Sequence, residues 1–171
     1  MKGYIQVYTG NGKGKTTAAF GLALRAAGAG KKVFIAQFVK GRDYAETDAF
    51  SAYLPQITLK QYGRECFIVK EPDEEDIKAA RRGLAEAEKI ITGGKYDIVV
   101  LDEANIALYY KLFTWNELKE ILKKKKEGTE IVITGRYAPQ ELIDMADLVT
   151  EMKEVKHYYT KGVKARKGIE Y

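Results

Sequence analysis

The sequence contains little cysteine and no long apolar run. Among its 171 residues there is one cysteine, Cys66, so no intramolecular disulfide can form and no Cys-x-x-Cys zinc pair is available. This composition fits a reducing compartment. No apolar stretch approaches the roughly 20 residues of a membrane-spanning helix, and no signal-peptide core precedes the first expected strand. We therefore expect a cytoplasmic protein that does not enter the membrane.

Histidine is also scarce, and the positive charge is concentrated at one end. The only histidine, His157, lies in a basic, aromatic stretch, where a structural role is commoner than a catalytic one. The length suits one domain, 1–171. The segment 153–171 holds six Lys or Arg against two Glu. Such a basic segment can bind nucleic acid, contact an anionic small molecule or stay solvated; the lack of a recognition helix or an RNA-binding signature argues against nucleic acid.

A glycine-rich stretch lies between an apolar run, 4–8, and a helical run of small residues, 18–29. It reads Thr9, Gly10, Asn11, Gly12, Lys13, Gly14, Lys15, Thr16, Thr17. The order strand, glycine-rich turn, helix is typical of a phosphate-binding loop, because glycines let backbone N–H groups approach an anion and the helix N-terminus adds partial positive charge. Lys15 would then reach the phosphates, and the Thr16 hydroxyl would ligate Mg²⁺.

The spacing of this loop departs from the standard pattern. That pattern has glycine five residues before the glycine of the Gly-Lys pair, and here that position is Thr9. The loop is therefore one residue shorter, with an additional cation at Lys13. A shorter loop should hold a polyphosphate differently, so ordinary transfer of the γ-phosphoryl group cannot be assumed.

Apolar runs alternate with helical patterns along the rest of the chain. We expect strands at 32–39, 57–62, 96–103, 130–134 and 147–152, and helices at 46–54, 72–93, 115–126 and 139–145. Pro72 would occupy the first helical position, and the acids that follow it indicate capping rather than catalysis. This alternation predicts an α/β fold, a mostly parallel sheet with helices on both faces.

Charged residues follow three of the expected strands. Asp102 and Glu103 end the strand 96–103, where carboxylates can hold Mg²⁺ directly or through water. Arg136 follows the strand 130–134 and would reach an anion or pair with a surface acid. Lys40 and Arg42 follow the strand 32–39, at the edge where open α/β sheets bind ligands, although a solvated loop would explain them equally well.

Six stretches together carry a resemblance to a known family: 9–21, 99–103, 134–136, 146–152, 155–157 and 168–171. They resemble the ATP:cob(I)alamin (corrinoid) adenosyltransferases of the phosphate-binding-loop type. The resemblance implies a RecA-like (P-loop NTPase-like) domain, commonly a homodimer, that transfers the 5′-deoxyadenosyl group of ATP to the Co(I) of a corrinoid and releases triphosphate. In this family the shortened loop is associated with ATP bound in reverse along it.

The resemblance also implies roles for the residues named above. Co(I) is itself a strong nucleophile, so no catalytic residue is expected, only alignment and stabilisation of the leaving triphosphate. The stretch Thr9 to Thr17 and Arg136 would bind ATP. Thr16 and Glu103, with Asp102 in support, would place Mg²⁺, with Mn²⁺ as an alternative ion. The family holds its corrinoid base-off and receives an electron from a reduced flavoprotein, which we expect here as a partner.

The corrinoid side of the site departs from the family pattern. Many members carry a Gly-Phe-Thr-Trp stretch whose aromatic rings shape the corrinoid face. Here Cys66-Phe67-Ile68-Val69 keeps Phe67 but places Val69 at the tryptophan position. The expected corrinoid contacts are Phe67, from this stretch, and the two cations after the strand 32–39, Lys40 and Arg42. Two other hypotheses stay open: a RecA-like ATPase acting on nucleic acid or a protein partner, and a non-catalytic nucleotide-binding module.

Overall fold

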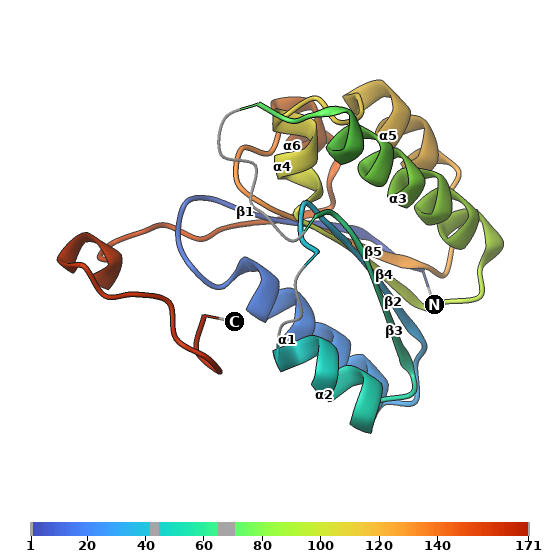
Figure 1. Cartoon of the computed structure of the whole chain (residues 1–171). Coiled ribbons are helices and arrows are strands. Elements are labelled where there is room, and N and C mark those ends of the chain that lie inside the picture. Colours follow the sequence, from blue (N-terminus) through green and yellow to red (C-terminus); the bar gives the residue numbers. More distant parts are fainter. Residues whose placement is uncertain (1, 42–44, 65–70, 171) are drawn as a thin grey trace.

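Six parallel strands form the central sheet. The computed structural model describes residues 2–41, 45–64 and 71–170 (Figure 1). The strands are β1 (Ile5–Thr9), β2 (Val33–Phe38), β3 (Ile57–Tyr62), β4 (Ile98–Asp102), β5 (Glu130–Thr134) and β6 (Leu148–Glu151). Their order in the sheet is β3-β2-β4-β5-β1-β6, and every pairing is parallel. All six lie within or next to the ranges expected from the sequence.

Helices cover both faces of the sheet. Figure 1 shows α1 (Lys15–Gly28) and α2 (Ala45–Tyr53) below it, and α3 (Glu74–Gly93), α4 (Ala104–Tyr109), α5 (Trp115–Lys123) and α6 (Gln140–Met145) above. A short 3₁₀ helix, η1 (Tyr158–Lys161), lies in the C-terminal segment. The expected α/β architecture is confirmed, and it is consistent with a P-loop NTPase-like fold.

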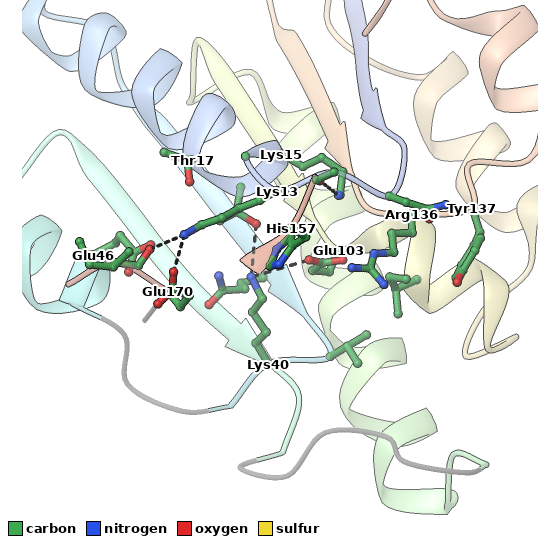
Figure 2. Close-up of a pocket in the computed structure, with 18 of the residues that line it drawn as sticks. Lys13, Lys15, Thr17, Lys40, Glu46, Glu103, Arg136, Tyr137, His157 and Glu170 are labelled. Carbon is green, nitrogen blue, oxygen red and sulfur yellow. Dashed lines mark hydrogen bonds and ion pairs between the residues drawn. The ribbon is translucent and has the colours of Figure 1, made fainter. Parts of the chain in front are cut away.

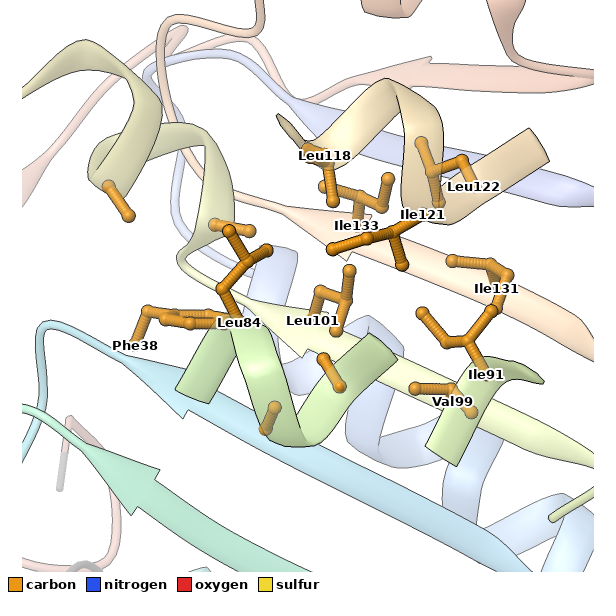
Figure 3. Close-up of a cluster of buried hydrophobic side chains, with 14 of the residues drawn as sticks. Phe38, Leu84, Ile91, Val99, Leu101, Leu118, Ile121, Leu122, Ile131 and Ile133 are labelled. Atoms are coloured by element: carbon orange, nitrogen blue, oxygen red, sulfur yellow. The ribbon is translucent and has the colours of Figure 1, made fainter. Parts of the chain in front are cut away.

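The strand sequences explain why both faces are covered. In β4, Val99 and Leu101 join the apolar cluster under α3 to α6, whereas Ile98 and Val100 join the cluster over α1 and α2. Figure 3 shows Val99 and Leu101 packed with α3 and α5 side chains such as Ile91. Because alternate residues of a strand point to opposite faces, a strand buried on both faces must be apolar throughout. The continuous apolar runs of the sequence have this cause.

Three local expectations need correction. The long helix α3 begins at Glu74, so Pro72 precedes the helix instead of opening it. Asp73 is the N-cap: its side chain accepts from the N–H groups of Glu75 and Asp76, and the Asp76 carboxylate accepts from the Asp73 N–H. The expected capping role of these acids is confirmed.

The helix α5 ends at Lys123, three residues before the expected end. The six-residue α4 was not expected, because so short a helix has no readable hydrophobic period.

The chain after β6 returns to the loop that follows β1. In Figure 1 this segment leaves the sheet, forms η1 and brings the C-terminus back towards α1. The sheet therefore places both the loop after β1 and the C-terminal segment at one edge. Within the part of the chain that the structure describes, no helix is long and apolar enough to cross a membrane.

Candidate nucleotide and corrinoid site

The carboxyl ends of the central strands border a cavity of about 520 Å³. Register brings them together, since Gln37 of β2 pairs with Asp102 of β4, and Tyr8 of β1 pairs with Thr134 of β5. Ligands of open parallel sheets bind at this edge. The lining comes from the loop after β1 and the start of α1, the ends of β2, β4 and β5, the helices α2 and α4, and the C-terminal segment. The lining residues are Asn11, Gly12, Lys13, Gly14, Lys15, Thr16, Thr17, Gln37, Val39, Lys40, Glu46, Glu103, Ile106, Tyr110, Arg136, Tyr137, His157, Ile169 and Glu170.

The glycine-rich loop passes directly against the end of β6. The Gly12 N–H donates to the Met152 carbonyl oxygen at 2.6 Å, and a Cβ at Gly10 would lie 2.5 Å from that same oxygen. Gly10 and Gly14 also have φ angles of 92° and 118°, which favour glycine. The helix α1 begins at Lys15 with no side-chain cap and no acid in its first turn, so its N-terminal N–H groups are open to an anion.

Lys15 folds back into the loop. Its Nζ donates to the carbonyl oxygens of Gly10 at 2.8 Å and Gly12 at 2.7 Å, and the residue is 7% exposed. Burial lowers the pKa of the Lys15 ammonium below its ordinary value, while the carboxylates of Glu103 and Asp102 oppose that shift. An incoming phosphate would give this buried cation a counter-charge at contact distance.

Asp102 accepts hydrogen bonds from four side chains. The hydroxyls of Thr134 and Thr16 donate to Oδ1 at 2.7 and 2.9 Å, while Gln37 Nε2 and Lys40 Nζ donate to Oδ2 at 2.9 and 3.1 Å. Burial alone would raise the pKa of this carboxyl, but the Lys40 ammonium and the hydrogen bonds outweigh burial and hold the pKa below its ordinary value. Asp102 is therefore a buried carboxylate, as the sequence led us to expect of the strand end.

Glu103 has a strained backbone at the start of α4. Its φ is 59°, a left-handed value that costs energy for a residue with a side chain and that is concentrated at functional sites. Its N–H donates to Thr134 Oγ1 at 3.0 Å, and its side chain lines the cavity. Burial, and then the neighbouring Asp102 carboxylate, raise the pKa of Glu103. A cation near both carboxylates would reverse that effect.

Lys40 lies between these groups. Its Nζ is 3.1 Å from Asp102 Oδ2, 3.3 Å from Thr16 Oγ1 and 3.9 Å from Glu103 Oε1. Figure 2 shows Lys40 pointing towards Glu103 in the cavity. The sequence interpretation placed Lys40 among the corrinoid contacts, which stays a prediction. What the structure shows is that its ammonium neutralises the two carboxylates beside the phosphate-binding loop.

A hydroxyl and two carboxylates meet beside Lys40, and they suit a hard divalent cation. Thr16 Oγ1 and Asp102 Oδ1 are in contact, with Glu103 on the same wall, and oxygen ligands of this kind are those that Mg²⁺ prefers. In residues 2–41, 45–64 and 71–170 no group of three or more His, Cys, Asp or Glu side chains is arranged to hold a metal. A cation here would therefore need further oxygens from phosphates or water, which is the usual mode of Mg²⁺ binding with nucleotides.

The C-terminal segment contacts the loop through Lys13. Lys13 Nζ donates to Glu170 Oε1 and to the Ile169 carbonyl oxygen, both at 2.9 Å, and to the Tyr158 hydroxyl at 3.2 Å. Glu170 also accepts from Arg166 and Tyr158. Arg166, then Lys13 and Tyr158, hold the pKa of Glu170 well below its ordinary value. Sequence reasoning gave Lys13 to the polyphosphate and missed that Ile169 and Glu170 line the cavity.

The remaining predicted residues have mixed positions. Asn11, Thr17 and Arg136 line the cavity, and Arg136 makes no hydrogen bond or ion pair with any residue that the structure describes. Thr9 is not part of the cavity lining, and its Oγ1 accepts from the Ala138 N–H at 3.4 Å. Arg42 and Phe67 lie outside the described residues.

His157 lines the same cavity, but its hydrogen bond is local. Its Nδ1 accepts from the Tyr159 N–H at 3.0 Å and caps η1, which agrees with the structural role favoured from the sequence. Sequence reasoning had no signal for Glu46 or for the apolar wall of the cavity, Val39, Ile106, Tyr110 and Tyr137. None of these residues belongs to a sequence motif, so only the three-dimensional structure places them in the cavity.

Comparison with known proteins agrees with this geometry. Residues 1–171 match the family model described as ATP:corrinoid adenosyltransferase BtuR/CobO/CobP. Corrinoid adenosyltransferases of Escherichia coli (strain K12) and Pseudomonas aeruginosa are each 36% identical, with 99% of this chain covered and 86% and 84% of the relatives. The corrinoid adenosyltransferase CobA of Salmonella typhimurium is 35% identical, with 99% and 86% covered. The chain therefore belongs to the ATP:corrinoid adenosyltransferase family.

Proposed function

We propose that this chain transfers the 5′-deoxyadenosyl group of ATP to the Co(I) of a corrinoid and releases triphosphate. The observation that carries the proposal is the meeting, in one cavity, of a shortened phosphate-binding loop with the Asp102–Glu103 pair, in a chain of this family. The step would serve adenosylcobalamin biosynthesis or salvage. No comparison favours the ATPase or the non-catalytic module.

The reaction needs little chemistry from side chains. Co(I) donates an electron pair to the 5′ carbon, a Co–C bond forms, and the C–O bond to the α-phosphate breaks with its electrons going to the triphosphate. The protein must align the two substrates and stabilise the negative charge that grows on the α-phosphate oxygen. Lys15, Arg136 and the N-terminus of α1 supply positive charge for this purpose, in the manner of an oxyanion site.

Thr16, Asp102 and Glu103 would hold Mg²⁺, or Mn²⁺ in its place. When bound, the ion neutralises charge on the polyphosphate and so makes it a better leaving group. Lys40 contacts all three residues, and a dication near Asp102 would repel its ammonium. We expect Lys40 to turn towards the phosphates or the corrinoid side when the metal site is filled.

Three broader assignments rest on the family resemblance. We propose a reduced flavoprotein as the electron donor and a homodimer as the assembly, with residues 1–171 acting as one catalytic domain in the cytoplasm. We further propose that the basic segment 153–171 contacts an anionic small molecule in the cavity. The segment turns back onto the phosphate-binding loop instead of extending away from the cavity, which supports this role.

An ATP analogue with a β–γ methylene bridge tests the reaction class. Adenosyl transfer never breaks the β–γ bond, so the analogue should still give adenosylated corrinoid when incubated anaerobically with protein, Mg²⁺ and chemically reduced corrinoid. The visible spectrum, and its change on exposure to light, detects the Co–C bond. ATP itself is the positive control. If ATP yields ADP and phosphate while the analogue yields no adenosylated corrinoid, the chain is an ATPase.

A further inference from the structure

Three tyrosine rings are in contact beside the cavity. Tyr109 and Tyr137 have ring centroids 4.4 Å apart with an interplanar angle of 32°, and Tyr109 meets Tyr110 edge to face at 5.4 Å. Tyr109 and Tyr110 come from the end of α4, and Tyr137 from the turn after β5. Two segments nearly 30 positions apart in the sequence thus build one aromatic surface, which we call the tyrosine stack.

Two of the three rings of the stack are exposed. Tyr109 is 57% exposed and Tyr137 is 51% exposed, whereas Tyr110 packs partly against the core. Tyr137 also has a φ of 61°, which is unfavourable for a bulky aromatic residue. Backbone strain that exposes an apolar ring does not help the fold, and such strain is concentrated at ligand sites.

The tyrosine stack continues the apolar wall of the cavity. Tyr110 and Tyr137 line the cavity together with Val39 and Ile106, while Tyr109 contacts the Tyr137 ring from outside the cavity lining. Figure 2 shows Tyr137 beside Arg136 at one end of the cavity, and Glu46 and Glu170 at the other. The end of the cavity that holds Arg136 is therefore the end to which the tyrosine stack belongs.

We propose that the tyrosine stack binds the corrin ring of the second substrate. A nucleotide held by its phosphates on the loop lies inside the cavity and cannot cover Tyr109, which lies outside the cavity lining. A ligand that covers both exposed rings must extend past the mouth, and it must present a broad, largely apolar face. The corrin macrocycle has that shape, and in the proposed reaction it must lie next to the 5′ carbon. The inference thus rests on the proposed function.

Replacing Tyr137 with glycine tests the proposal without damage to the fold. Glycine adopts a φ of 61° at no steric cost, so Tyr137→Gly removes the ring and relieves strain at once. We expect the dissociation constant for cob(II)alamin, measured by difference absorbance with saturating ATP, to rise about tenfold. Tyr109→Ala should act in the same direction, and Tyr137→Phe should keep the binding. Tyr53→Ala, at an 80% exposed tyrosine of α2, is the matched control and should match the parent.

Three results would overturn the inference. Unchanged cob(II)alamin affinity in Tyr137→Gly and Tyr109→Ala would remove the rings from the corrinoid site. A parallel loss of ATP affinity, measured by calorimetry without corrinoid, would show that the rings hold adenine. A change in oligomeric state by light scattering would show that the stack is a contact between copies of the chain. Because binding is measured directly, these results are obtained even if turnover fails, and absent turnover with normal binding would count against the proposed function alone.

Discussion

The inner and outer parts of the cavity are built in different ways. The inner part, around Lys15, Thr16 and Asp102, is largely buried and hydrogen-bonded, with Asp102 0% exposed and satisfied by four donors. The outer part, from Arg136 and Tyr137 to Glu170, has exposed side chains at its first two residues and a half-buried one at Glu170, and it is held by turns and by the C-terminal segment. The strand ends of the sheet and the glycine-rich loop form the inner part, whereas turns and the C-terminal segment form the outer part. Changes to Asp102 and the side chains that donate to it should therefore cost folding as well as binding, whereas changes to the outer part should affect binding alone.

Asp102→Asn should have the largest effect. In one orientation the amide NH₂ of asparagine would face the Gln37 amide and the Lys40 ammonium, which both donate here. In the other it would face two threonine hydroxyls, which would have to turn to accept although they already accept from other donors. The substitution also removes the negative charge that the Lys40 ammonium contacts at 3.1 Å. We expect the free energy of unfolding, measured by urea denaturation, to fall by about 3–5 kcal/mol, as when one partner of a buried ion pair is removed.

The matched control is Asp144→Asn, an aspartate of α6 that accepts one exposed hydrogen bond from Gln140. Its unfolding free energy should change by less than about 0.5 kcal/mol. If Asp102→Asn were as mild, the buried network would contribute little to the fold, and the contrast between the inner and outer parts would disappear.

The inner part was predictable because its signals are local. The loop is one continuous stretch, and the acids follow an apolar run, so strand periodicity places both at one edge of a parallel sheet. All six strands were found in this way. The boundary errors at Pro72 and Lys126 arose because capping geometry and helix ends depend on single hydrogen bonds that periodicity does not encode.

The outer part was not predictable because its contacts join distant segments. Lys13 meets Glu170 across 157 positions, and no motif links a glycine-rich loop with a C-terminal glutamate. The stacking of Tyr109 on Tyr137 depends on α4, which was too short to be recognised. The sequence left Lys40 open between a ligand contact and a solvated loop, and its contact with Asp102 follows from the pairing of β2 with β4. In each case tertiary proximity, absent from the sequence pattern, decides the role.

Lys15→Ala should have the next largest effect, and it acts on binding. The ammonium lies in the phosphate-binding loop, and a charge-assisted contact to phosphate contributes about 1.5–3 kcal/mol per bond. ATP affinity by calorimetry should fall about 10- to 100-fold, at 1.4 kcal/mol per factor of ten. Lys31→Ala, beyond the far end of α1, is the control. Equal ATP affinity in both variants would exclude this loop as the nucleotide site.

Glu103→Gln should weaken Mg²⁺ binding more than folding. The amide keeps the size of the side chain and removes the charge that a hard cation needs. We expect lower turnover and a higher Mg²⁺ concentration at half-maximal activity, with an unfolding transition close to that of the parent. A variant with the metal dependence of the parent would remove Glu103 from the metal site.

Lys40→Met should move metal affinity in the opposite direction. Without its ammonium, the carboxylates of Asp102 and Glu103 lose a counter-charge, so stability in EDTA should fall by roughly 1–3 kcal/mol. A dication should then bind about tenfold more tightly, which corresponds to about 1.4 kcal/mol. Thermal unfolding followed through a Mg²⁺ titration measures both, since bound metal raises the melting temperature. Lys40→Arg keeps the charge and serves as the control. Weaker Mg²⁺ binding in Lys40→Met would mean that Lys40 supports the metal instead of competing with it.

Glu170→Gln should have the smallest effect, confined to the C-terminal segment. The carboxylate joins Lys13, Tyr158 and Arg166, so its neutralisation weakens the contact between the segment and the loop. Trypsin cleavage after Lys164 or Arg166 should become a few times faster, because these exposed sites depend on that contact for protection, while the unfolding transition should stay in place. Glu154→Gln, an exposed glutamate of the same segment, is the control. ATP should increase protection more in the parent than in Glu170→Gln, because bound nucleotide would add contacts to a segment that is already held against the loop. Equal cleavage of the parent, Glu170→Gln and Glu154→Gln would mean that the Lys13 contact does not hold the segment in place.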